Sequence, residues 1–276
     1  MHPLDGPRLK LRRADKHLNA IKVAIDRFIA SKPYTFVLDA DPKPPNYSIV
    51  ARVKHLPDEE LGIIIGDFAH NARSALNLLV YQLSQLPITD AKRYRLEFPI
   101  FDDVKDYANK VKIYLAGVAP EHITIIESFQ PYKGLQGPYD DALGILHAIN
   151  NADKHRITNI VGAVGSFNGM GFGGGRVGTN IFIGKGAAVN VGRNSSVNFG
   201  DGYTYKTVGD GVIYKDRTVV AKLTSNAPPQ GNLYPYFHIA IQFGEGDPRV
   251  QGRPVVDTLT LIYNRVKEVI ERFKHV

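Results

Sequence analysis

Two clusters of polar residues in this 276-residue sequence have the types and spacing for chemistry, and the first occupies a helical pattern at positions 66–77. Three of its side chains share one helix face and three share the adjoining face: His70, Arg73 and Asn77, then Asp67, Asn71 and Ser74. Six polar groups on an otherwise apolar helix are costly to bury unless they pair with each other or with a ligand. The segment therefore predicts either a buried network that fixes helix register or a polar pocket inside a helical bundle.

The second cluster is the run Asn150-Asn151-Ala152-Asp153-Lys154-His155-Arg156, which ends a later helical pattern. The helix macrodipole favours cations at a helix C-terminus, and this alone is sufficient to explain the three basic residues. It explains neither Asp153 nor the paired asparagines. A structural and a functional interpretation of this cluster therefore both stay open.

A third contribution comes from Arg13 and His17, which lie one helical turn apart near the start of the chain. His17 flanks the apolar position Leu18, so it faces the bundle interior or lies at the edge of the core. Ionisable groups on separate helices destabilise a bundle unless they pair, which is simplest if they face one common cavity. We therefore expect one set of residues to converge: Asp67, His70, Asn71, Arg73, Asp153, His155 and His17.

Such a set has the parts for cleaving RNA without a metal, which needs a base for the 2′-hydroxyl, an acid for the leaving oxygen and cations on the phosphate. Histidine supplies the acid or base near neutral pH, and arginine contacts phosphate through two N–H groups. The catalytic candidates are His155, with Asp153 orienting it, and His70, Arg73 and His17. The substrate-binding candidates are Asp67, Asn71, Asn77, Asn151, Lys154, Arg156 and Arg13.

Neither a metal nor a cofactor is expected. The chain has no cysteine, and none of its nine histidines has a convincing metal-ligand spacing. Gly169, Gly171 and Gly174 match the G-x-G-x-x-G pattern of dinucleotide sites, but more glycines and a strand-like run follow where that site needs a helix. We interpret these glycines as part of a β connection.

The elements that must position these residues follow from hydrophobic periodicity. Helical spacing predicts helices over 8–31, 57–86, 103–116, 120–128, 139–154 and 255–273. Strand-like runs are predicted at 34–38 and 47–53, and a series of them with glycines and Asp-Gly turns follows residue 156. The fold class is α+β: a helical bundle with a glycine-rich antiparallel β insertion and a C-terminal helix that rejoins the bundle. The expected domains are a helical bundle over 1–156 with a β-hairpin at about 34–53, an antiparallel β region over 157–249, and a C-terminal helix over 250–276 packing on the bundle.

Charge and hydropathy indicate the partners. The net charge is +7, and residues 8–32 alone hold eight basic and two acidic side chains. A concentrated basic element is typical of proteins that bind polyanions, although a solvated helix face also explains it. No run reaches the roughly 18 apolar residues that a membrane span needs. We therefore expect a cytoplasmic protein that binds RNA or a nucleotide, with a homodimer as a further expectation and no membrane association.

Six segments together resemble a group of uncharacterised bacterial proteins, many of them actinobacterial. The two longest are G-D-x-x-H-N-x-R-S-A-L at 66–76 and N-x-x-D-K-H-R at 150–156. The others are R-A-D-x-H-L at 13–18, F-P-I-F at 98–101, I-E-S-F-Q-P-Y at 126–132 and G-R-P-V-x-x-T-L at 252–259. The resemblance covers most of the chain except its glycine-rich middle.

More loosely, the helical part resembles HEPN domains, which are helical bundles of prokaryotic defence and toxin systems. In those domains an Arg-x4–6-His motif cleaves RNA without a metal. Related sequences read R-S-A-L-D-H, whereas Asn77 and Leu78 stand here in place of Asp-His. Arg12 and His17 satisfy the Arg-x4-His spacing. The resemblance implies a metal-independent ribonuclease or a protein that binds RNA or nucleotide phosphodiesters; a non-catalytic binding or scaffold protein with a structural polar network is the alternative.

Overall fold

The computed structural model divides into two compact units, which we describe separately. The helical unit comprises residues 1–24, 59–159 and 243–276, and the sheet unit comprises residues 25–58 and 160–242. Within these, the structure describes residues 3–40, 46–135, 137–153, 160–173, 196–198, 203–207, 212–213, 215–225 and 232–275. The sequence candidates Lys154, His155 and Arg156 lie outside the described residues.

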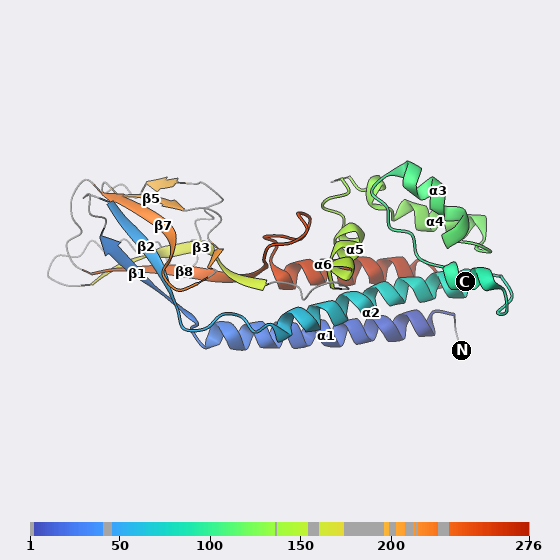
Figure 1. The fold of residues 1–276 in the computed structure, drawn as a ribbon, viewed down its shortest axis with the longest axis horizontal. Helices are drawn as coiled ribbons and strands as arrows, with labels where there is room; N and C mark the ends of the chain where they lie inside the picture. The colour runs from blue at the N-terminus through green and yellow to red at the C-terminus, as the bar shows by residue number, and fades with distance from the viewer. Residues whose placement is uncertain are drawn as a thin grey trace. The chain divides into compact units, whose positions relative to one another are not determined.

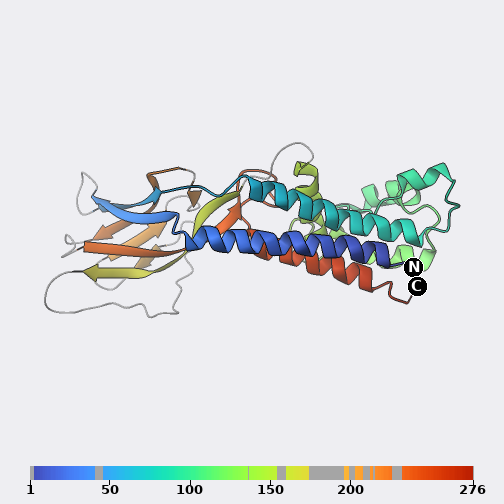
Figure 2. The ribbon, with the colours of Figure 1, turned by 90° about the horizontal axis from the view of Figure 1, so that it is seen from below.

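Three long helices lie side by side in the helical unit: α1 (Asp5–Ala30, in this unit through Ala24), α2 (Glu60–Leu83) and α6 (Val255–Glu271). α1 runs antiparallel to the other two (Figures 1 and 2). Its apolar positions at spacings of three and four are buried: Leu11, Ala14, Leu18 and Ile21. Arg8 at the start of α1 donates two hydrogen bonds of 3.0 Å to Glu271 at the end of α6, which ties the antiparallel pair together.

α2 is buried on more than one side, as its apolar residues predict. Phe68, Ala72, Leu76 and Leu79 are fully buried, and so are other positions around the helix, including Ile65. α5 (Ala142–Asp153) and α6 pack against it. α2 is therefore the central helix of the unit, although Asp67 and His70 on it are exposed.

Shorter elements connect α2 to α5. They are η1 (Ala91–Arg95), α3 (Val104–Tyr114), α4 (Pro120–Ser128) and η2 (Pro131–Lys133). The side chains of Asp90 and Asp103 accept backbone N–H groups at the starts of η1 and α3, as helix caps do. The buried Gln130 donates to the carbonyl of Pro99 (2.8 Å) and accepts from the N–H of Phe101 (3.2 Å), so it joins the 98–101 segment to the end of α4.

The sheet unit contains two antiparallel sheets. One has the order β1-β2-β7-β5-β4, and the other β6-β3-β8. Their strands are β1 (Tyr34–Ala40), β2 (Asn46–Val53), β3 (Ile160–Gly173), β4 (Ser196–Asn198), β5 (Tyr203–Thr207), β6 (Val212–Ile213), β7 (Thr218–Ser225) and β8 (Asn232–Phe243). Tyr34, Ile49, Ile213 and Val220 form part of a buried apolar cluster in this unit.

The α+β fold class is confirmed: a helical bundle, an antiparallel β insertion and a C-terminal helix that returns to the bundle. The hairpin at 34–53 was expected in the helical domain. It groups instead with the sheet unit, because β2 pairs with β7. Part of the strand series predicted after residue 156, at 174–195, lies outside the described residues. Among the helices the structure describes, none is long and apolar enough to cross a bilayer.

Candidate functional site

Four predicted site residues come together in the helical unit, and we call them the histidine–carboxylate cluster: His17 of α1, Asp67 and His70 of α2, and Asp153 at the end of α5. The charge of Asp67 acts on both His17 and Asp153, and His70 acts on Asp153 as well. Side chains from three helices are therefore close enough to influence one another's protonation. Three of the four were proposed as catalytic residues and Asp67 as a substrate-binding residue.

Gly66 determines where Asp153 sits. A Cβ atom at position 66 would overlap the Asp153 carboxylate, whose two oxygens and carbon are its three nearest neighbours. Glycine inside a helix costs about 1 kcal/mol relative to alanine, so its presence here needs a compensating reason. The close approach of the Asp153 carboxylate to the α2 backbone supplies that reason.

The environment shifts two of the four groups in opposite directions. Burial raises the pKa of Asp153, the nearby Asp67 charge raises it further, and His70 opposes the shift. Burial also lowers the pKa of His17, Arg13 lowers it further, and Asp67 opposes the change. His17 is therefore neutral and able to accept a proton near pH 7, which is the state a general base requires.

The cluster is open to solvent. Asp67 and His70 are exposed, whereas His17 and Asp153 are half-buried. The Ser74 hydroxyl lies 3.5 Å from Nε2 of His70, one turn along α2. Within the described ranges, no three His, Asp or Glu side chains are arranged to hold a metal ion. The arrangement offers proton transfer at a surface that a large substrate can reach.

Arg73 does not join this cluster. Arg73 is 6% exposed, and its Nη2 donates to Oε1 of Glu97 at 2.5 Å. Burial lowers the pKa of Arg73, and Glu97 opposes that shift. Its Nη1 is buried with no hydrogen-bond partner in the described part of the chain. Arg73 thus holds the segment after η1 against α2 instead of offering a cation to solvent.

Two asparagines of α2 also form hydrogen bonds within the protein. Asn71 donates to the carbonyl of Asp67 one turn back on the same helix (2.8 Å). Asn77 accepts from the N–H of Phe98 (3.1 Å), which fixes the start of the F-P-I-F segment. The six polar residues of α2 therefore divide into a solvent-accessible group around His70 and a structural group around Arg73.

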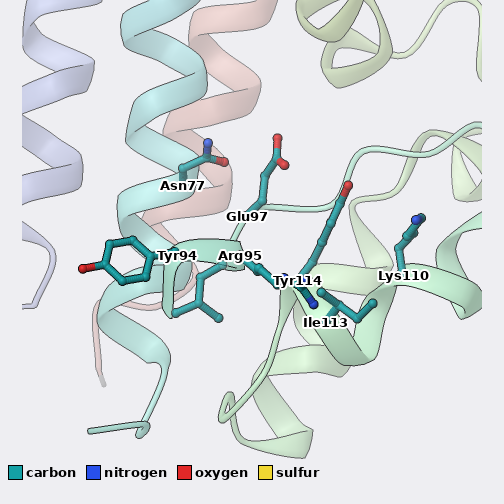
Figure 3. A pocket seen from close by; sticks show the side chains of 8 residues that line it. Asn77, Tyr94, Arg95, Glu97, Lys110, Ile113 and Tyr114 are labelled. Atoms are coloured by element: carbon teal, nitrogen blue, oxygen red, sulfur yellow. The ribbon is translucent and has the colours of Figure 1, made fainter. Parts of the chain in front are cut away.

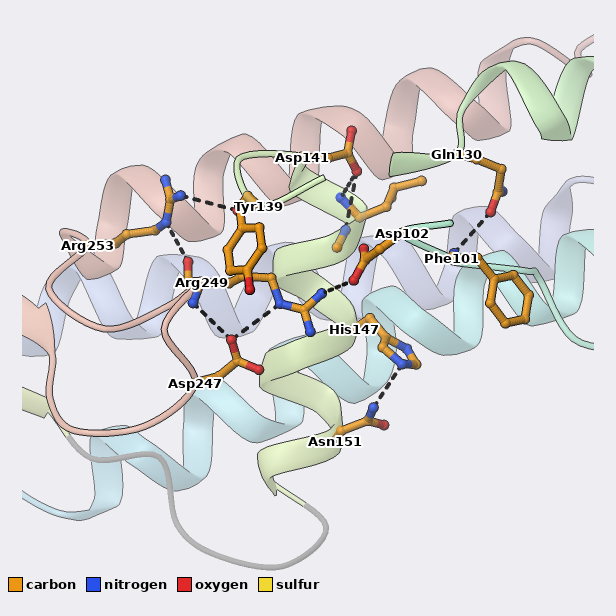
Figure 4. Close-up of polar contacts among 12 residues, drawn as sticks. Phe101, Asp102, Gln130, Tyr139, Asp141, His147, Asn151, Asp247, Arg249 and Arg253 are labelled. Carbon is orange, nitrogen blue, oxygen red and sulfur yellow. Dashed lines mark hydrogen bonds and ion pairs between the residues drawn. The ribbon is translucent and has the colours of Figure 1, made fainter. Parts of the chain in front are cut away.

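His147 on α5 is a titratable group that the sequence analysis missed. Its Nε2 lies 2.9 Å from the side-chain nitrogen of Asn151, one turn later, as Figure 4 shows. Burial lowers the pKa of His147, and the positive charges of Arg73 and Arg249 lower it further. Its Nδ1 is buried and unpartnered among the described residues. The i, i+4 spacing to Asn151 was the available sequence signal.

Arg249, in the segment after β8, joins two carboxylates near His147. It donates to Asp102 at 2.7 Å and to Asp247 at 3.3 Å (Figure 4). Arg253, in the G-R-P-V signature segment, pairs with Asp140. These ion pairs tie the chain that enters α6 to the loops around α5, so they are structural contacts of the helical unit.

A pocket of about 560 Å³ opens beside η1 and α3 (Figure 3). Its lining consists of Asn77, Tyr94, Arg95, Leu96, Glu97, Lys110, Ile113 and Tyr114. Only Asn77 among them was a predicted binding residue. The others belong to short elements that match no known motif, so spacing alone gave no reason to select them.

Comparison of the chain with protein-family models, curated proteins and solved structures finds no significant match. The resemblance to HEPN domains therefore stays a prediction. A functional assignment depends on the geometry of the helical unit, and above all on the histidine–carboxylate cluster.

Proposed function

We propose that the helical unit is a HEPN-like protein that acts on RNA phosphodiesters without a metal, with the histidine–carboxylate cluster as its reaction site. One observation carries the proposal: Asp67 of α2 is close enough to His17 of α1 and to Asp153 of α5 to influence both, His70 likewise influences Asp153, and Asp67 and His70 are exposed. The lowered pKa of His17 supports it, because a general base must be free of its proton near neutral pH.

In the proposed reaction, His17 removes the proton of the ribose 2′-hydroxyl. The 2′-oxygen then bonds to phosphorus while the bond from phosphorus to the 5′-oxygen breaks. His70, flanked by Asp67 and Asp153, gives its proton to the leaving oxygen. The products are a 2′,3′-cyclic phosphate and a 5′-hydroxyl end, and the step consumes neither water nor a metal.

The basic face of α1 suits a polyanionic substrate. Arg12, Arg13 and Lys16 are exposed on this helix, and Arg13 is close enough to His17 to lower its pKa. An arginine beside the base is well placed for the phosphate whose charge develops during cleavage. Binding through these cations should weaken steeply as the salt concentration rises.

A second candidate function, a non-catalytic binding protein with a structural polar network, has its own supporting observation. The ion pair of Arg73 with Glu97 and the hydrogen bond that Asn77 accepts from the Phe98 backbone both join groups of the protein itself. A network of this kind fixes helix register and needs no ligand. It accounts for part of the signature, but not for the exposed Asp67 and His70.

The test is cleavage of a fluorescently labelled single-stranded RNA by the full chain in excess EDTA. We expect cyclic-phosphate ends, and a loss of about 10²–10⁴-fold in rate for His17→Asn or His70→Asn, which is the usual contribution of a general acid or base. His275→Asn is the matched control, since His275 is exposed and outside the cluster. Salt-sensitive RNA binding without cleavage would favour the second candidate, and neither binding nor cleavage would refute both.

A further inference from the structure

The pocket beside η1 and α3 uses different residues from the histidine–carboxylate cluster, and none of the four cluster residues lines it. Its volume of about 560 Å³ lies in the range of small-molecule sites. Its lining combines aromatic rings, cations and a fixed donor and acceptor. We propose that it binds a nucleotide, as a free mononucleotide or as one unit of a single-stranded RNA.

Two tyrosines supply surfaces for a base. Tyr94 is 94% exposed, so its ring is open to contact by a ligand. Tyr114 is half-buried and stacks on Phe101, with ring centroids 6.0 Å apart and an interplanar angle of 26°. The stacking holds the Tyr114 ring at the pocket. Stacking of a base on an aromatic side chain contributes about 1–3 kcal/mol to binding, whichever base it is.

Two unpaired cations supply the contacts for a phosphate. Arg95 on η1 and Lys110 on α3 are exposed, and neither forms an ion pair within the described ranges. By contrast, Arg93, two residues before Arg95, is fully occupied. It donates to the carbonyls of Leu86 and Ser84 and its guanidinium lies 4.4 Å from the Tyr81 ring centroid. Arg93 therefore anchors η1, and the neighbouring Tyr94 and Arg95 project from a fixed backbone.

A hydrogen-bonding wall completes the pocket. Oε1 of Glu97 accepts from Arg73, which holds the carboxylate in place, while the side chain remains 40% exposed. Its second oxygen has no partner among the described residues and can accept from a base N–H. Asn77 uses its oxygen for Phe98, which leaves its amide nitrogen as a donor. Figure 3 shows Glu97 and Tyr114 extending in the same direction, so ring and acceptor face a common space.

This combination favours a nucleotide over a simple anion or an acidic peptide. A simple anion needs the cations and leaves the tyrosines unused, and the Glu97 carboxylate repels an acidic peptide. A nucleotide uses a ring, a phosphate and a polar base edge together. Each part of the ligand therefore has a counterpart on the pocket wall.

The experiment is calorimetric titration of the full chain with AMP, ribose 5-phosphate and a 2′-O-methyl hexanucleotide. The hexanucleotide has no free 2′-hydroxyl, so the proposed reaction cannot cleave it during the titration. We expect AMP to bind at least tenfold more tightly than ribose 5-phosphate, because only AMP has a ring to stack. Arg95→Gln with Lys110→Gln should weaken AMP at least tenfold. Lys112→Gln is the matched control, since Lys112 is exposed on α3 but does not line the pocket.

The oligonucleotide distinguishes the two sources of the ligand. Hexanucleotide binding that AMP displaces, and that Tyr94→Ser weakens, assigns the pocket to single-stranded RNA. AMP binding alone assigns it to a free nucleotide. Equal affinity for AMP and ribose 5-phosphate, no binding of any probe, or an equal loss in Lys112→Gln would overturn the proposal. His17→Asn should leave AMP affinity unchanged, so failure of the pocket is distinguishable from failure of the reaction site.

Discussion

Gly66→Ala is the sharpest perturbation of the histidine–carboxylate cluster that the structure offers. The added methyl group overlaps the Asp153 carboxylate, so the carboxylate must turn away from α2. The obstructing atoms are the end of a side chain and not backbone, so the helices need not separate. The substitution therefore moves one charged group without removing it.

The stability change should be small because two effects offset each other. Alanine in a helix interior gains about 1 kcal/mol over glycine. Holding the displaced Asp153 side chain about 30° off a staggered rotamer costs about 0.5–1.5 kcal/mol. We expect the free energy of unfolding, measured by urea denaturation, to change by less than about 1 kcal/mol.

RNA cleavage should respond much more strongly, since a misplaced catalytic group costs up to about 100-fold in rate. We expect a loss of tenfold or more for Gly66→Ala, and a similar loss for Asp153→Asn. Gly6→Ala is the control, because a Cβ there meets only Leu78 at an ordinary 3.9 Å. Unchanged cleavage in Gly66→Ala, or a loss of several kcal/mol in stability, would show that the position of Asp153 does not serve the reaction.

Three further predictions concern stability. Burial lowers the pKa of His147, so His147 takes up a proton in the unfolded chain first as the pH falls below about 6.5. The free energy of unfolding should therefore fall between pH 7 and 5. Urea titrations of His147→Gln should show a weaker pH dependence than those of the unaltered chain. Gln130→Met leaves the buried Pro99 carbonyl and Phe101 N–H without partners and should cost about 2–4 kcal/mol in urea denaturation, against less than about 0.5 for the exposed Gln82→Met. In the sheet unit, the methyl group of Gly162→Ala would overlap the Tyr34 hydroxyl and should lower the free energy of unfolding by about 1–3 kcal/mol, seen in calorimetry as a lower melting temperature. Adding Tyr34→Phe should partly restore the melting temperature, because the buried hydroxyl of Tyr34 has no partner among the described residues.

The helices were predictable because periodicity and terminal residues act locally. The pattern at 120–128 matches α4 residue for residue, since Pro120 begins the helix in the position where proline is favoured. The pattern at 57–86 was too long at its end, because Ser84 leaves the helix to pair with Val118. That pairing joins distant parts of the chain, and no local propensity reports it.

The same distinction separates what was predictable about the site. Helical spacing put Asp67 and His70 among the polar residues expected in a buried network or a pocket inside the bundle, whereas the structure leaves both exposed, because spacing on one helix does not say where its neighbours lie. The partner of Arg73 is Glu97, which lies in an irregular segment where no periodicity indicates direction. The hairpin strand β2 likewise pairs with β7 across most of the chain length, so its sheet could not be inferred from its own residues.

The division of labour along α2 explains why one helix carries so many polar side chains. Arg73 and Asn77 hold the segment after η1 against α2, and the pocket wall includes Asn77 itself and Glu97, the partner of Arg73. Gly66 admits Asp153, which brings the end of α5 to Asp67 and His70. The contacts of Arg73 and Asn77 thus fix the α2 backbone from which Asp67 and His70 project. Loss of the Arg73–Glu97 ion pair should therefore lower the affinity for a nucleotide at the pocket more than it lowers the rate of RNA cleavage at the cluster.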